Sequence, residues 1–326
     1  MSKQEHKGWQ NKLSAWYWPI VAAIITFIVA VELMRSVLGI KLGTLANLAL
    51  YFGLYFVYAW IFSVLAGGKK ERVPHPAENW PVSGPIRYCG RYMMFFTFYP
   101  TVMLSVLNPF QFVQQMKQIF GQAKAAKYLS KHEEENANYQ TKVSYRLPFS
   151  GEWLVFNGGL TKETSHSWGV YPQRYAYDFV VADENYRRHR NQGARLHDYF
   201  CYNHPILAAA AGEVVAVLDR VRPAPLVGFG IADFLCTHFA GNHVVIRHAE
   251  GEYGFYAHLI KGSIPVKVGD HVSQGQVIGH CGHTGHSSEP HLHFHLQNGP
   301  SFYSSMGLPI RFEGAGEITR GEKVTG

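Results

Sequence analysis

Two long uncharged apolar runs in the first third of the chain constrain its fold more than any other feature. Residues 13–31 contain no Asp, Glu, Lys or Arg and begin close to an aromatic cluster at residues 16–18. Residues 42–68 are also uncharged and are rich in Leu, Phe and Tyr. A helix of about 20 apolar residues spans the ~30 Å hydrocarbon layer of a bilayer, and aromatic side chains favour its interfaces. The runs therefore predict two transmembrane helices. No clear small-residue cleavage site follows the first, so we expect it to be retained.

A third uncharged run covers residues 92–116, but Pro100 interrupts it and Asn108 with several Gln residues follows. A re-entrant or interfacial helix is the alternative to a third crossing. Lys and Arg cluster before residue 13 and again in residues 69–91, which by the positive-inside rule places both segments in the cytoplasm. Three crossings, which we favour, would put the rest of the chain outside the cytoplasm, whereas two would leave it inside.

Residues 111–142 are predicted to form an amphipathic helix. Phe112, Ile119 and Phe120 recur near helical spacing, and lysines such as Lys117 and Lys124 lie between them. Such a helix either lies on anionic lipid headgroups or connects two domains with a solvated face. Polar residues then suggest a domain boundary near residue 141.

From residue 143 the pattern changes to short stretches rich in β-branched and aromatic residues, separated by Gly, Asn, Asp and Pro. The predicted strands are residues 153–156, 174–181, 213–218, 243–248, 254–258, 276–279 and 291–297. Many short strands with turn residues between them indicate an antiparallel sheet, sandwich or barrel. We therefore expect a membrane region at residues 1–110 with two or three transmembrane helices, a linker helix at 111–142, and a mainly antiparallel β domain at 143–326.

Composition narrows the function classes. Charged residues make up 16% of the chain, below the roughly 25% typical of soluble domains, and the net charge is +7. Lys and Arg crowd residues 1–146, where membrane topology accounts for them, and no nucleic-acid-binding motif occurs, so we expect no nucleic-acid partner. The four cysteines form no CxxC pair, which argues against a cysteine zinc knuckle.

The histidines point to a metal site. His291, His293 and His295 alternate in the segment PHLHFHL, and a strand places alternate side chains on one face, about 6.6–6.8 Å apart. Imidazoles in such register can share a zinc ion, whose Zn–N distance is only ~2.0 Å. Asp178 ends the segment RYAYD, where a carboxylate needs a cation or hydrogen bonds, and His258 ends another predicted strand.

These motifs carry a family resemblance. The order YDF, HPILAAAAGEVV, GNHVVIRH, YGFYAHL and VKVGDHVSQGQVIGHCGHTGHSSEPHLHF over about residues 143–300 resembles the M23 zinc metallopeptidases, the lysostaphin and LytM-like peptidoglycan endopeptidases. The resemblance implies a compact antiparallel β domain with a groove across one sheet and one Zn²⁺ ion per chain. It further implies that Asp178 and His293 are metal ligands. His258 and His291 match the unliganded histidines that orient the attacking water and stabilise the oxyanion.

Two positions depart from the family pattern. The usual first ligand is a His four residues before the Asp, and this chain has Arg174 there, which cannot ligate zinc. The resemblance implies that the upstream His166, in TSHSW, replaces it; the poorer candidates are His189, His197 and His204. His295 matches no functional position, and we place it on the strand surface or behind the ligands.

The predicted function is hydrolysis of peptide bonds by zinc-activated water, with peptidoglycan cross-links as substrate and the β domain outside a bacterial inner membrane that the chain crosses several times. One alternative is a degenerate, non-catalytic module that binds wall peptides or regulates an amidase. Another is a protease that acts on a different polypeptide. The segment at residues 221–241, which lies between two predicted strands, either lines the substrate groove or packs as a surface loop.

Overall fold

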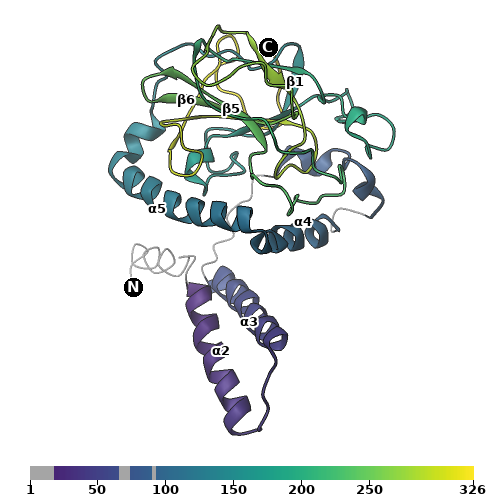
Figure 1. Cartoon of the computed structure of the whole chain (residues 1–326), viewed down its shortest axis with the longest axis vertical. Coiled ribbons are helices and arrows are strands. Elements are labelled where there is room, and N and C mark those ends of the chain that lie inside the picture. Colours follow the sequence, from purple (N-terminus) through teal and green to yellow (C-terminus); the bar gives the residue numbers. More distant parts are fainter. Residues whose placement is uncertain (1–17, 66–73, 90–92) are drawn as a thin grey trace. The chain divides into compact units, whose positions relative to one another are not determined.

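The computed structural model describes residues 18–65, 74–89 and 93–326, and it divides the chain into two compact units, Met1–Arg72 and Val73–Gly326 (Figure 1). We call the first the helical unit and the second the β unit. The helical unit contains α2 (Trp18–Ser36) and α3 (Thr44–Leu65). The two helices pack together, with 2.7 Å between the hydroxyls of Thr26 and Tyr58. Residues 13–17 and 66–68 of the predicted spans lie outside the described residues.

Both helices of the helical unit are apolar along most of their length and leave many large apolar side chains exposed, among them Ile25, Ile28 and Trp60. Within the described part of the chain, one helix, over Pro19–Ser36, is long and apolar enough to cross a membrane. The apolar stretch Ala46–Phe62 of α3 is shorter. The predicted helices are therefore present, and their insertion in a bilayer stays a prediction.

The predicted third crossing is wrong for a reason of length. Helix α4 (Met93–Leu104) has 12 residues and contains Pro100, and the 3₁₀ turn η3 (Ser105–Leu107) ends it. A helix of that length rises about 18 Å, well short of the ~30 Å hydrocarbon layer. Asn108 then starts a new helix by accepting a hydrogen bond from the Phe110 amide (3.0 Å).

The packing of residues 74–89 gives a second reason. This segment precedes α4, forms the short helices η1 (Pro76–Asn79) and η2 (Pro85–Cys89), and packs on the β unit. Trp80 stacks on Tyr186 with ring centroids 4.9 Å apart, and the Gly84 amide donates to His189 Nε2 (3.0 Å). Because segments on both sides of α4 belong to one folded unit, α4 cannot carry the chain across a membrane.

The β unit is built on a nine-stranded sheet whose strand pairs are all antiparallel, in the order β11-β1-β2-β9-β6-β5-β4-β7, with β10 also paired to β9. A second, two-stranded sheet pairs β3 with β8. The strands are β1 (Glu152–Asn157), β2 (Tyr177–Val180), β3 (Pro205–Leu207), β4 (Gly212–Leu218), β5 (Asn242–Ala249), β6 (Glu252–Leu259), β7 (His271–Val272), β8 (Val277–His280), β9 (Leu292–Gln297), β10 (Gly307–Leu308) and β11 (Lys323–Thr325). The remaining 3₁₀ turns are η4 (Tyr171–Gln173) and η5 (Leu196–Asp198). The predicted mainly antiparallel β fold is therefore confirmed.

The core of the β unit lies beneath the middle strands of the large sheet, where period-two alternation sends apolar side chains inward. On β9, Leu292, Phe294 and Leu296 are fully buried in this core. Alternation then places His293 and His295 on the opposite face of the same strand. One strand thus supplies both a core stripe and a row of imidazoles.

The predicted domain boundaries differ from the observed division. Helix α5 (Pro109–Ala137) covers most of the predicted linker, but it belongs to the β unit, as does α4. The reason is a set of long-range hydrogen bonds, such as those from Gln111 Nε2 to the Asp233 carbonyl (2.9 Å) and from Asn136 Nδ2 to the Gly307 carbonyl (3.0 Å). The boundary between the units falls at residues 72 and 73 rather than near residue 141.

Candidate metal centre

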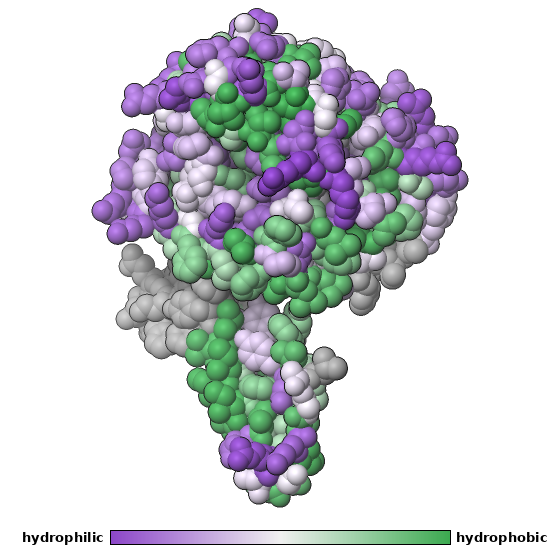
Figure 2. All heavy atoms as spheres, in the orientation of Figure 1, coloured by the Kyte–Doolittle hydropathy of each residue, from purple (hydrophilic) through white to green (hydrophobic). Residues whose placement is uncertain are grey.

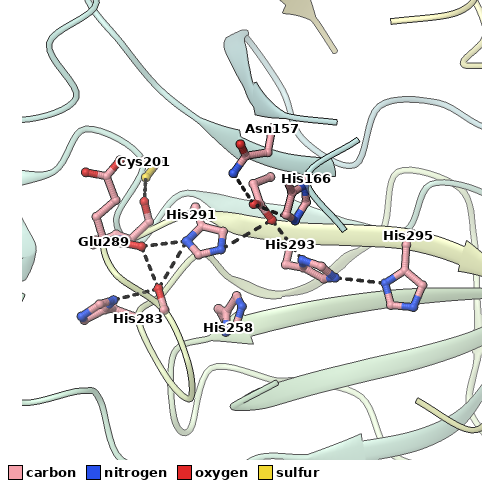
Figure 3. A network of polar contacts seen from close by, with 12 residues as sticks. Asn157, His166, Cys201, His258, His283, Glu289, His291, His293 and His295 are labelled. Carbon is pink, nitrogen blue, oxygen red and sulfur yellow. Dashed lines mark hydrogen bonds and ion pairs between the residues drawn. The ribbon is translucent and has the colours of Figure 1, made fainter. Parts of the chain in front are cut away.

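Strand pairing brings the two central residues of the site together. Strands β2 and β9 are neighbours, and Asp178 lies directly opposite His293 in their register. Both side chains are buried, and His293 Nδ1 lies 3.0 Å from Asp178 Oδ1 (Figure 3). The metal hypothesis requires this placement, with the two side chains on one face of the sheet and within reach of a common ion.

His166 reaches the same place from a loop. Ser165 Oγ donates to the Arg174 carbonyl (2.7 Å) and Ser167 Oγ to the Gln173 carbonyl (2.5 Å), so the residues flanking His166 are tied to the end of η4, just before β2. His166 Nε2 then lies 3.4 Å from Asp178 Oδ2. The loop therefore returns onto the strand that carries the aspartate.

Arg174, which stands where the family resemblance implies a first ligand, holds this loop. Its guanidinium lies over the rings of Trp168 (4.5 Å) and Tyr171 (5.0 Å), and its Nε donates to the Trp168 carbonyl (3.3 Å). Cation–π contacts of a buried arginine are worth about 1–2 kcal/mol each. The residue that replaces the usual histidine thus stabilises the loop that presents another one.

The potential ligand atoms of His166, Asp178 and His293 all lie within 4.8 Å of one another. His291 Nε2 is 3.7 Å from Asp178 Oδ1. Burial raises the pKa of Asp178, but the imidazoles of His166, His291 and His293 outweigh it and hold the pKa well below the usual range. The aspartate is therefore a carboxylate, the form that binds a cation.

A chain of hydrogen bonds fixes the proton on His293. Gln297 Nε2 donates to the Gly299 carbonyl (2.8 Å), which turns its Oε1 toward His295 Nε2 (3.0 Å). His295 must donate there, so its Nδ1 accepts from His293 Nε2 (3.1 Å). His293 Nδ1 is left with a lone pair that faces the carboxylate of Asp178. Two acceptors at this distance repel each other, and either a second proton on the ring or a metal ion removes the repulsion. With His166 beside the pair, these residues fit a metal ion.

A second chain supports Asp178 from the other side. Asn157 Nδ2 donates to Asp178 Oδ2 (2.8 Å), and Asn157 Oδ1 lies 3.1 Å from His75 Nε2. His75 Nδ1 accepts from the Ala77 amide (3.0 Å), so the proton of this ring is on Nε2 and points at the amide oxygen. Sequence reasoning missed Asn157 and His75. A strand-ending amide resembles an ordinary turn residue, and no local pattern relates the two positions.

His258 and His291 are each anchored to the backbone through Nδ1. His258 Nδ1 lies 2.7 Å from the Thr284 carbonyl and His291 Nδ1 2.7 Å from the Glu289 carbonyl, so each ring donates to the backbone and keeps a lone pair on Nε2. Their ring centroids are 4.7 Å apart. Burial, together with the neighbouring imidazoles, lowers the pKa of His258 well below its ordinary value. His258 also adopts φ 63°, a left-handed conformation that is unusual for a residue with a side chain and often marks a functional position.

The other histidines that the sequence offered as candidates have different partners. His189 accepts from the Gly84 amide, His197 packs on Tyr202, and His204 packs on Trp153. None of the three belongs to a metal-binding cluster among the described residues. His295 is fully buried, so the strand-surface alternative is wrong, and the alternative behind the ligands agrees with its contact to His293.

Part of the β unit is similar to known proteins. Residues 196–304 match the family model described as peptidase family M23. The chain carries an M23 peptidase domain. The match includes the segments with His258, His291 and His293, whereas Asp178 and His166 precede it.

The M23 domain has curated relatives that are similar over short stretches. Peptidoglycan DD-endopeptidase ShyA of Vibrio cholerae is 44% identical over 86 residues, which are 26% of this chain and 16% of that protein. Cell division protein DipM of Caulobacter vibrioides is 34% identical over 97 residues, 30% of this chain and 13% of that one. Lysostaphin of Staphylococcus simulans is 39% identical over 87 residues, 26% and 17% of the two chains. The chain therefore spans less than a fifth of the length of each of these relatives.

Solved structures were compared as well. The catalytic domain of the antimicrobial peptidase lysostaphin from Staphylococcus simulans matches 53% of this chain and 92% of that domain, with 22% identity and a TM-score of 0.28. A zinc-containing peptidase from Vibrio cholerae matches 51% and 38% of the two chains, with 26% identity and a TM-score of 0.26.

Proposed function

We propose that this chain is a membrane-anchored zinc endopeptidase that hydrolyses peptide bonds of peptidoglycan. The observation that carries the proposal is the cluster of potential ligand atoms, with His293 Nδ1 held 3.0 Å from the Asp178 carboxylate and His166 beside them. Two imidazoles and one carboxylate are a typical ligand set for catalytic zinc, which keeps its fourth position for water.

The roles of the side chains follow from their protons. A zinc ion bound by His166, Asp178 and His293 would lower the pKa of its water toward ~7 and polarise the scissile carbonyl. His291 Nε2, which carries a lone pair, accepts the proton of the attacking water and returns it to the leaving amine. His258 is neutral and also accepts through Nε2. Its Nε2 therefore accepts a hydrogen bond from the attacking water and helps to orient it.

Peptidoglycan is the proposed substrate because the relatives include a peptidoglycan DD-endopeptidase. The non-catalytic alternative rested on the missing ligand at residue 174. His166 beside Asp178 fills that role in our proposal, and the unliganded pair His258 and His291 is also present. A module that only binds wall peptides has no need for the four imidazoles and the carboxylate in this arrangement.

The proposal is tested on the full chain purified in mild detergent, by measuring zinc content and digestion of purified peptidoglycan with the cleaved bond identified by mass. About one zinc per chain and release of cross-link fragments are expected, and Asp178→Ala should lose both. His271→Ala, which changes an exposed histidine on β7, is the matched control. Protein that binds no zinc would overturn the proposal in favour of the non-catalytic module.

The membrane side of the β unit is a separate prediction. A peptidoglycan substrate requires the β unit outside the cytoplasm, and α4 adds no crossing. If α2 and α3 both cross, the N-terminus must then also lie outside, against the lysines that precede residue 13. We expect a reporter linked after Gly326 to be active only outside the cytoplasm. Cytoplasmic activity would leave the peptidase chemistry intact and replace peptidoglycan with another polypeptide as substrate.

A further inference from the structure

The first half of helix α5 buries polar side chains and exposes apolar ones, the opposite of what is usual for a helix that faces water. Its buried positions include Gln111 and Gln114, which are 0% and 6% exposed. Its exposed positions include Phe110 and Phe120, which are 60% and 73% exposed. A helix on the surface of a soluble domain turns its apolar stripe inward and its amides outward. In the first half of α5 this order is reversed, whereas the second half buries the apolar side chain of Leu129.

The reversed orientation is fixed by specific bonds. Gln111 Nε2 donates to the Asp233 carbonyl (2.9 Å), and its Oε1 lies 2.7 Å from His286 Nε2. Gln114 Nε2 donates to the Thr237 carbonyl (2.8 Å), and its Oε1 accepts from the Tyr303 hydroxyl (2.9 Å). Rotating α5 to bury its phenylalanines would leave these buried polar groups unpaired, at about 1–3 kcal/mol each.

A third contact leaves no room for such a rotation. Gly121 lies directly against the backbone of Tyr303, where any side chain would collide. The helix is therefore pinned to the β unit at three points along one side. Its aromatic side is held away from the protein by these contacts.

The exposed apolar surface continues beyond α5. Residues on α4, on η3 and on the loop at 226–235 add to it, and the loop is held to α4 by bonds such as that from Thr97 Oγ1 to the Gly230 carbonyl (3.0 Å). We call this set the apolar face: Phe98, Met103, Leu104, Val106, Leu107, Phe110, Phe112, Val113, Ile119, Phe120, Leu226, Phe229 and Leu235. Figure 2 shows apolar residues gathered where α4 lies. The segment at 221–241 thus packs on the helices, as a surface loop would, and whether it also lines the substrate groove stays a prediction.

We propose that the apolar face lies in the interfacial layer of a lipid bilayer, so that the β unit sits in the surface of the membrane. Charge supports lipid over a protein partner. Residues 93–132 contain four lysines, Lys117, Lys124, Lys127 and Lys131, and no Asp or Glu, which suits anionic headgroups. All four lysines are exposed on α5.

The length of the segment between the two units also supports a lipid bilayer as the surface that the apolar face contacts. Residues 66–73 separate the end of α3 from the first described residue of the β unit, and eight residues reach at most about 30 Å. If α3 ends at a membrane surface, the β unit must lie close to that surface. Helix α4 is too short to cross, and the segments on both sides of it belong to the β unit. A short apolar helix of this kind lies in the plane of the interface.

The test places nitroxide labels on the full chain in vesicles of phosphatidylcholine and phosphatidylglycerol. Leu107→Cys and Phe120→Cys are labelled in a Cys89→Ser background, and Lys261→Cys, on an exposed turn of the β unit, is the matched control. We expect lipid-soluble oxygen to relax the labels at 107 and 120 while water-soluble nickel chelate does not, with the reverse at 261.

Two outcomes would overturn the proposal. Relaxation by the nickel chelate at 107 and 120 would show that the apolar face is in water. Protection from both reagents would show that a protein surface covers it. Neither result depends on zinc or on cleavage of any substrate, so this test is independent of the proposed peptidase activity.

Discussion

The metal centre and helix α5 depart from ordinary burial in opposite directions. In the centre, ionisable side chains such as Asp178 and His293 are buried where an apolar core is usual. On α5, Phe110 and Phe120 are exposed where polar side chains are usual, while Gln111 is buried.

The two regions also share a property. Hydrogen bonds to the rest of the β unit hold each region in place, and each region still lacks one interaction partner. His293 Nδ1 and the carboxylate of Asp178 face each other at 3.0 Å beside His166, an arrangement that a cation completes. The apolar face needs an apolar surrounding. A reversed burial pattern that internal hydrogen bonds hold in place therefore indicates the chemistry of the missing partner, which is a cation at the metal centre and an apolar surrounding at the apolar face.

The largest expected effect comes from removing a ligand. His166→Ala should abolish zinc binding as fully as Asp178→Ala, because a site with two protein ligands holds catalytic zinc poorly. Metal analysis of the purified full chain measures this, with His271→Ala as control. If His166→Ala keeps one zinc per chain, His166 leaves the ligand set and the loop that Arg174 stabilises has another purpose.

The central pair of the site was predictable from the sequence, whereas the loop ligand was less so. His293 and His295 share a face because strand alternation is a local rule, and the strand bearing Asp178 was recognisable. His166 reaches the site only because Ser165 and Ser167 tie its loop to the end of η4, just before β2. Those bonds form only in the folded loop, and no periodic pattern of residues in the sequence predicts them.

The outer part of the site and the shape of α4 were not predictable for related reasons. His75 and Asn157 are 82 positions apart, and each alone looks like an ordinary polar residue. The uncharged run at residues 92–116 has the composition of a span, but composition does not show that Asn108 starts a new helix. The short strands β7 and β10, with two residues each, are too brief for any pattern to mark them.

His248 provides a contrast to the metal centre, because its buried imidazole finds all of its hydrogen-bond partners within the protein. Burial lowers the pKa of His248 to about 4, and its Nδ1 lies 3.0 Å from the Ala211 carbonyl while its Nε2 lies 3.0 Å from the Tyr256 hydroxyl. In the unfolded chain a histidine has a pKa near ~6.5, so that state binds more protons between pH ~6.5 and 4. Stability is therefore full above pH ~6.5 and falls as the pH falls toward 4.

The contribution of His248 to this loss is at most about 3 kcal/mol. Urea unfolding of metal-free protein at pH 7 and pH 5 should show a smaller pH dependence for His248→Gln than for the unchanged chain. An identical pH dependence in both would mean that His248 is not neutral in the folded state, and that burial without an external partner does not set the pKa here.

The chain behind His293 should have a smaller effect on the metal. Gln297→Leu removes the acceptor that fixes the proton of His295, so His293 Nε2 loses its defined partner and Nδ1 its defined lone pair. Partners of this kind are worth about 10–100-fold in metal affinity. Competition with a zinc chelator measures the effect, and Gln140→Leu, on an exposed residue, is the control. Unchanged affinity in Gln297→Leu would show that the carboxylate alone orients His293.

The smallest effects, from a pair of substitutions on α5, test the comparison most directly because ordinary burial predicts the opposite order. Gln111→Leu adds apolar surface at a buried position, yet it should lower the free energy of unfolding by about 1–3 kcal/mol, because His286 Nε2 and the Asp233 carbonyl lose their partner. Phe120→Ser removes a large aromatic side chain, yet it should change that free energy by less than about 0.5 kcal/mol, because the ring is exposed. Chemical denaturation of the full chain in mild detergent measures both. If Phe120→Ser is the more destabilising of the two, the ring packs against protein, and the apolar face is part of a core rather than a surface that meets lipid.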